Sequence, residues 1–157
     1  MRESPQVAGA QSDRCESRVV VAFVGETDIP WLRLLRPGFR HCFAVIECSG
    51  HWLIYDPASH QTRLDRLGRL ALAELLNWLT LPNTTLICCR TKAAPARLAP
   101  VRPYTCVEAV KRILGIRAAL VLTPWQLFRH LTKENKNKIS LSEKILDILK
   151  NLSYTSF

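Results

Sequence analysis

Short apolar runs, separated by glycine, proline and polar turns, divide most of the chain into candidate strands. The runs at 18–24 and 84–90 are rich in apolar and β-branched residues, which predicts buried strands. The runs at 41–48 and 51–56 flank a Ser-Gly dipeptide, a connection typical of a two-residue β-hairpin. A shorter apolar run at 118–122 predicts one more strand.

Four segments have helical signals. A proline-containing stretch at 27–35 predicts a short helix, and 69–80 carries apolar residues every three or four positions. The segment 106–114 ends at a glycine, and 124–131 begins with a Thr-Pro pair that is typical of a helix start. Between them, the proline-rich stretch 91–103 predicts an extended connector.

The composition divides the chain into three parts. Residues 1–17 are polar and predict a flexible leader, while 18–131 predict one folded domain. Residues 132–157 begin with a lysine-rich linker and continue into an amphipathic helix, which opens with a capping box. Its apolar face is formed by Leu141, Ile145, Leu149 and Leu152. We expect this tail helix to dock on the body or to bind a partner protein.

Bulk composition limits the class of protein. With 157 residues, 48% of them hydrophobic, the chain is long and apolar enough to bury a core. It has no apolar run long enough to span a membrane, and its N-terminus lacks the apolar segment of a signal peptide. We therefore expect a cytoplasmic or virion-associated protein. The six cysteines form no C-x-x-C pair, which predicts reduced thiols.

The formal charge of +9 raises the question of nucleic-acid binding. However, the basic residues are scattered singly over turns and helix faces, and no lysine- or arginine-rich block is present. This distribution favours a solvated basic surface over a nucleic-acid site, which only the charge supports.

Candidate chemistry lies at the start of two predicted elements. Cys106 opens the helix 106–114, where the positive end of the helix dipole favours a thiolate. His41 opens the strand 41–48 and offers an imidazole that can hold and return a proton. A thiol and an imidazole are the minimum set for nucleophilic catalysis by cysteine.

The hairpin register supplies a third group. A Ser-Gly loop pairs Phe43 with Asp56, so Asp56 lies on the same face as His41 and diagonal to it. A carboxylate beside the imidazole would complete a Cys-His-Asp triad. We expect the helix that begins at Cys106 to lie across this face, with its backbone N–H groups directed at an oxyanion.

Each of these residues also has a structural interpretation. Cys106 can be a small buried apolar residue, as free cysteines often are. His41 can be a strand-end histidine bonded to a loop, and Asp56, which precedes a proline, can start a turn. Their joint placement at a strand start, a hairpin diagonal and a helix start favours the catalytic interpretation.

The same alternation argues against a metal site. It places Cys42, Cys48 and His51 on the face opposite to His41, and the two cysteines lie about 20 Å apart along the strand. The neighbours Cys88 and Cys89 point to opposite faces of their strand. These residues cannot close one tetrahedral site, so we expect neither a metal nor a cofactor.

Residues 41–59 resemble the histidine hairpin of NlpC-type cell-wall peptidases. Residues 105–110 and 122–127 resemble the cysteine helix and the trailing Thr-Pro segment of the circularly permuted branch of the papain-like superfamily. That branch includes lecithin–retinol acyltransferase-like proteins and bacterial permuted amidases. The resemblance implies an α+β fold, with an antiparallel sheet of about five strands packed against the cysteine helix.

The resemblance also implies residue roles: Cys106 is the nucleophile, His41 the base and Asp56 the orienting group. The family often has His, Asn or Gln at the third position, so Asp is a departure. A thiol peptidase or amidase acting on cell-wall peptide, in a phage-associated setting, is the leading expectation, and an acyltransferase acting on an acyl-lipid ester is second. The alternative from another class is a non-catalytic basic adaptor or virion-assembly protein with the same fold.

Overall fold

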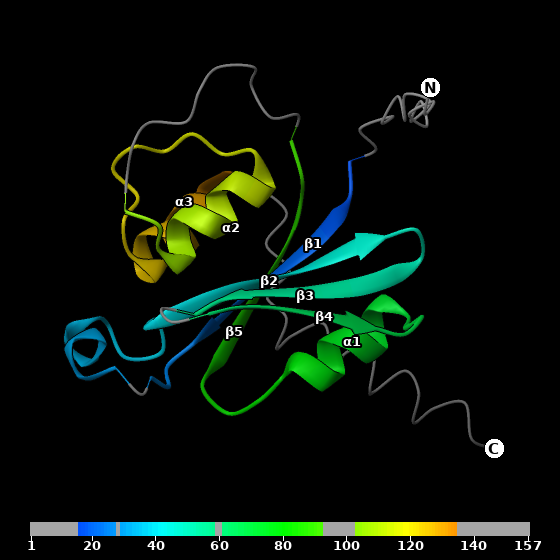
Figure 1. Cartoon of the computed structure of the whole chain (residues 1–157), viewed down its shortest axis with the longest axis horizontal. Coiled ribbons are helices and arrows are strands. Elements are labelled where there is room, and N and C mark those ends of the chain that lie inside the picture. The colour runs from blue at the N-terminus through cyan, green and yellow to red at the C-terminus, as the bar shows by residue number, and fades with distance from the viewer. Residues whose placement is uncertain (1–15, 28, 59–60, 93–102, 135–157) are drawn as a thin grey trace, which may run out of the picture.

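An antiparallel five-stranded sheet forms the centre of the protein (Figure 1). It is seen in a computed structural model that describes residues 16–27, 29–58, 61–92 and 103–134. The strand order is β4-β3-β2-β1-β5, and every neighbouring pair is antiparallel. The strands are β1 (Arg18–Val24), β2 (His41–Cys48), β3 (His51–Pro57), β4 (Thr62–Leu67) and β5 (Thr84–Arg90). The expected α+β class is confirmed.

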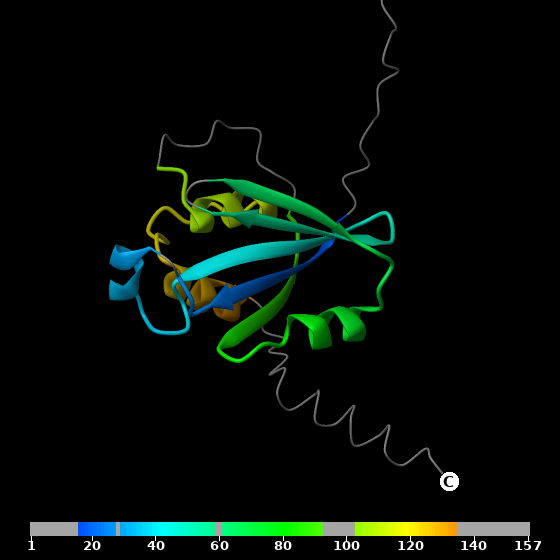
Figure 2. The ribbon, with the colours of Figure 1, turned by 60° about the horizontal axis from the view of Figure 1, so that its bottom comes forward.

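Helices cover both faces of the sheet (Figures 1 and 2). The helices α2 (Cys106–Leu114) and α3 (Pro124–Glu134) pack on one face, and α1 (Leu72–Leu79) packs on the other. A 3₁₀ helix, η1 (Pro30–Leu34), leads into β2. No helix among the described residues is long and apolar enough to cross a lipid bilayer.

The central strand β1 explains why the sheet needs two helical layers. Val19, Val21 and Phe23 belong to the apolar cluster under α2 and α3. Val20 and Ala22 belong to the cluster under α1, and all five side chains are buried. A strand buried on both faces has no polar positions, which accounts for the unbroken apolar run in the sequence.

Most of the predicted elements are present at the predicted residues. The strands at 18–24 and 84–90, the hairpin and the helix 106–114 are confirmed. The helix predicted over 69–80 begins later, at Leu72, and the last helix continues to Glu134 instead of ending at 131. Residues 132–134 are therefore helical and not part of a linker. Most of the predicted leader and the whole predicted tail helix lie outside the described residues.

The sequence-based interpretation missed β4. Its residues are mostly charged or polar and five of the six are exposed, so they show no apolar face. As the outer strand beside β3, β4 is stabilised mainly by backbone pairing, and charged residues suit a sheet edge.

The predicted strand at 118–122 is wrong. This segment is a turn whose carbonyl oxygens at Ala118 and Val121 each accept a hydrogen bond, 3.0 Å long, from the ammonium of Lys111. Lys111 is buried and also forms an ion pair with Glu108, at 2.8 Å. A buried cation needs several oxygen partners, and the loop supplies two of them instead of pairing in the sheet.

Gly115 ends α2 in the left-handed conformation, with φ of 69°. The next backbone N–H, of Ile116, donates to the carbonyl of Lys111 at 2.9 Å. Lys92 donates its N–H to the carbonyl of Leu114 at 3.0 Å, so the chain leaving β5 is tied to the end of α2. A Cβ at position 115 would lie 2.5 Å from the carbonyl oxygen of Lys92.

We expect Gly115→Ala to lower the free energy of unfolding by about 2 kcal/mol, because alanine resists the left-handed conformation and its methyl group collides with the Lys92 backbone. Gly68→Ala is the matched control, since a Cβ there meets no atom within 4 Å. Urea unfolding curves of the two variants provide the comparison. Equal midpoints would contradict the close packing of β5 against the end of α2.

Candidate active site

Thr105 sets where α2 begins and therefore where Cys106 lies. Thr105 has an extended backbone, and its hydroxyl oxygen accepts a hydrogen bond of 3.2 Å from the N–H of Glu108. This is the usual N-cap arrangement, and it places Cys106 in the first turn of the helix. Helix geometry leaves the N–H groups of Cys106 and Val107 without acceptors inside the helix. Their partial positive charge favours a thiolate at this position.

The predicted contact between His41 and Asp56 is present. The Nε2 atom of His41 lies 2.7 Å from Oδ1 of Asp56, and both side chains are largely buried. The hairpin register, in which Ala44 pairs with Tyr55, brings the start of β2 beside the end of β3. Two residues of one hairpin are thus joined by local pairing alone, which is why the sequence was sufficient to predict them.

The ring of His41 also forms a hydrogen bond with Cys106. Because Nε2 is engaged with Asp56, the other ring nitrogen, Nδ1, is the one left for the sulfur. His41 is the first residue of β2, and Cys106 is the first residue of α2. The structure therefore brings all three predicted residues into one cluster.

The predicted position of α2 is wrong. We expected the helix to cover the face shared by His41, Phe43 and Val45, but Val45 belongs to the cluster under α1. The helix α2 packs on the opposite face, where Cys42 and Ala44 lie beneath it. The apolar residues of β1 require a helical layer on each face of the sheet. The alternation of side chains along β2 shows which residues share a face, but it does not show which helix packs on that face.

This placement adds Cys42 to the site, a residue that sequence reasoning considered only as a candidate metal ligand. Cys42 is fully buried and lies in the cluster against which Cys106 packs. Its side chain and its backbone N–H both form hydrogen bonds with the Cys106 sulfur. The sequence shows that Cys42 lies next to His41. Its contact with Cys106 could not be predicted from this position, because the contact depends on which face of the sheet α2 covers.

The surroundings of Cys106 lower the pKa of its thiol to about 5. The hydrogen bond with the Cys42 side chain is the largest cause. Burial opposes it, and the hydrogen bond and positive charge of His41 add to the lowering. Cys42 itself stays protonated because burial raises its pKa well above the usual value, so it acts as a donor.

His41 is shifted in the opposite direction. Burial lowers its pKa, but the hydrogen bonds to Asp56 and Cys106 and the negative charges of both outweigh burial and raise the pKa to about 9. The hydrogen bond with His41 lowers the pKa of Asp56, which keeps this carboxylate ionised. Between about pH 5 and pH 9 the stable form of the pair is therefore a thiolate beside an imidazolium.

The first turn of α2 also contains the carboxylate of Glu108, whose negative charge is paired with two cations. Glu108 is buried and pairs with Lys111 at 2.8 Å and with Arg112 at 3.3 Å. Its charge is thus balanced by two cations. Beside the site, the hydroxyls of Tyr55 and Tyr104 are hydrogen bonded, and Arg112 lies over the Tyr104 ring at 5.8 Å from its centroid.

None of the five cysteines in the described part of the chain forms a disulfide, and no group of three or more His, Cys, Asp or Glu side chains in that part could hold a metal ion. Comparisons with protein-family models, with curated proteins and with solved structures found no match.

We expect Cys42→Val to raise the pKa of Cys106, because the valine side chain is apolar and cannot donate a hydrogen bond to the thiolate. Alkylation of Cys106 by iodoacetamide at pH 6 should slow several-fold, as measured by mass-spectrometric mapping. Cys89→Val, which changes a half-buried thiol on β5 that packs against the same cluster, is the control. A rate unchanged in both variants would show that Cys42 does not support the thiolate.

Proposed function

We propose that the protein is a cysteine-dependent hydrolase in which Cys106 attacks an acyl carbonyl, His41 transfers protons and Asp56 orients His41. The observation that carries this proposal is the hydrogen-bonded cluster of the three residues, with charges that favour a thiolate–imidazolium pair. A thiol that served only as a small buried apolar residue would have a raised pKa, as Cys89 has. The low pKa of Cys106 and its partial exposure favour a nucleophile.

The proposed reaction has two halves. The Cys106 thiolate forms a bond to the carbonyl carbon, and the carbonyl oxygen becomes an oxyanion that the N–H groups of Cys106 and Val107 can stabilise. The bond to the leaving amine breaks as the His41 imidazolium gives that amine its proton. His41, now neutral, then removes a proton from water, which attacks the thioester and releases the acid. The thiolate is regenerated, and the two proton transfers balance.

A peptide or amide bond is the substrate class that this arrangement supports best. An amide leaving group must be protonated, and the raised pKa of His41 keeps a proton at the site at neutral pH. The resemblance to NlpC-type peptidases points to cell-wall peptide, encountered by a phage-associated protein. An acyl-lipid ester, which needs less help from an acid, is the second substrate class.

Alkylation of Cys106 in the intact protein should follow a single ionisation near pH 5, whereas an ordinary cysteine ionises near pH 8.5. His41→Ala removes a hydrogen bond and a positive charge, so this midpoint should move upward and labelling at pH 6 should fall several-fold. His51→Ala, on the exposed hairpin turn, is the matched control. Slow and equal labelling of every cysteine would support the non-catalytic adaptor instead.

Turnover should depend on all three residues to different degrees. On a panel of wall-derived peptides and model esters, Cys106→Ala should lower kcat by roughly 10³-fold or more, and Asp56→Asn by a smaller factor. Asp56→Asn should also lower the upper limit of the bell-shaped pH profile from about 9, because the carboxylate that raises the pKa of His41 is lost. Circular dichroism of each variant controls for folding. Full activity of Cys106→Ala would end the proposal.

A further inference from the structure

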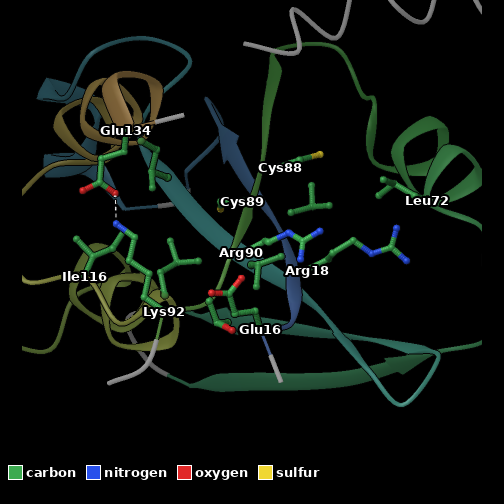
Figure 3. A pocket seen from close by; sticks show the side chains of 14 residues that line it. Glu16, Arg18, Leu72, Cys88, Cys89, Arg90, Lys92, Ile116 and Glu134 are labelled. Carbon is green, nitrogen blue, oxygen red and sulfur yellow. Dashed lines mark hydrogen bonds and ion pairs between the residues drawn. The ribbon is translucent and has the colours of Figure 1, made fainter. Parts of the chain in front are cut away.

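A groove of about 450 Å³ lies beside the last three residues of β5, at the end of the sheet opposite to the catalytic cluster (Figure 3). The catalytic end is marked by the pair Val24–His41, and the groove end by the pair Arg18–Arg90. The groove is lined mainly by apolar side chains from β5, from the ends of α2 and α3 and from the start of α1. They include Leu72, Cys88, Cys89, Ile116 and Leu131.

The groove follows an edge of the sheet. In the strand order β4-β3-β2-β1-β5, β5 is an outer strand, so its outward backbone N–H and C=O groups have no strand beside them in the described part of the chain. Its side chains alternate between the two apolar layers: Cys88 packs against the cluster under α1 and Cys89 against the cluster under α2 and α3. Unlike β4, β5 carries few charges that would protect an edge. An apolar edge of this kind is commonly covered by a helix or loop.

Three stretches of chain outside the described residues start at the groove, and their sequences distinguish them. Glu16, Lys92 and Glu134 all line it. Residues 1–15 are mostly polar and small, and residues 93–102 are rich in proline and alanine and are held at both ends by β5 and α2. Only the stretch that follows Glu134 contains apolar residues at helical spacing.

The reach and length of that stretch also fit the groove. Glu134 is held at its rim by an ion pair with Lys92, at 2.7 Å (Figure 3). The five residues 135–139 can extend at most about 17 Å. The thirteen residues 140–152 would form a helix about 20 Å long, against about 17 Å for the five extended residues 88–92 that line the groove.

We propose that residues 140–152 fold back as an amphipathic helix along β5 and fill this groove with their apolar face. That face consists of Leu141, Ile145, Leu149 and Leu152. The tail then covers the apolar edge of the sheet and leaves the catalytic cluster at the other end open. This intramolecular docking site does not depend on the proposed catalytic activity.

The natural cysteines of β5 report on the docking in the full-length chain. The variant Ile145→Ala/Leu149→Ala removes apolar volume from the docking face. The control Asp147→Ala/Lys150→Ala changes two residues on the opposite side of the predicted helix, leaves its capping box intact and keeps the net charge. The measurement is the rate at which a maleimide alkylates Cys88 and Cys89 at pH 8, mapped by mass spectrometry, with Cys106 labelling followed in the same samples.

We expect Cys88 and Cys89 to react several-fold faster in Ile145→Ala/Leu149→Ala, with the control equal to the natural chain and Cys106 unchanged in all three. Equal rates in all three proteins would overturn the proposal, as would equal acceleration in both variants. Protection that rises with protein concentration, together with a dimer in sedimentation, would also overturn it, because the groove would then hold a second copy's tail. If the protein proved not to be a hydrolase, the alkylation rates of Cys88 and Cys89 would still test the docking of the tail.

Discussion

The contact between the first residues of β2 and the first turn of α2 is the interaction on which the proposed chemistry depends. His41 and the side chain and backbone of Cys42 all form hydrogen bonds with the Cys106 sulfur. The contact joins segments that are far apart in the sequence, so it exists only when α2 is packed on the sheet. Val107, Val110 and Leu114 hold the helix there through the buried cluster that includes Cys42. The interface between α2 and β2 therefore both holds the helix on the sheet and brings His41 and Cys42 to the thiol of Cys106.

Burial works against the thiolate, and the site overcomes it by giving every charge a partner. A buried ionised group is costly unless hydrogen bonds replace its lost hydration. Cys106 receives such bonds from Cys42 and His41, and the charge of His41 is shared with Asp56. The two cysteines thus have opposite roles although both are largely buried. Cys42 is kept protonated by its surroundings and donates, while Cys106 is kept ionised and accepts.

The two ends of the sheet carry different features. One end holds the proposed catalytic cluster, and the other holds the apolar edge of β5 and its groove. The helix α2 connects them: its first residue is Cys106, and its last carbonyl, of Leu114, accepts the N–H of Lys92 beside the groove. Buried Lys111 also fixes the loop after α2. The orientation of Cys106 is therefore supported along the whole helix.

The sequence by itself determined the features that depend on near neighbours. Alternation and the Ser-Gly turn were sufficient to place Asp56 beside His41, and Gly115 was sufficient to end the helix that carries Cys106. The tertiary structure alone decided which face α2 covers, and with it the role of Cys42. It also decided that β4 pairs at an edge and that 118–122 turns around Lys111. The physical reason is that a local pattern encodes which residues share a face, whereas the choice of covering layer follows from packing between distant segments.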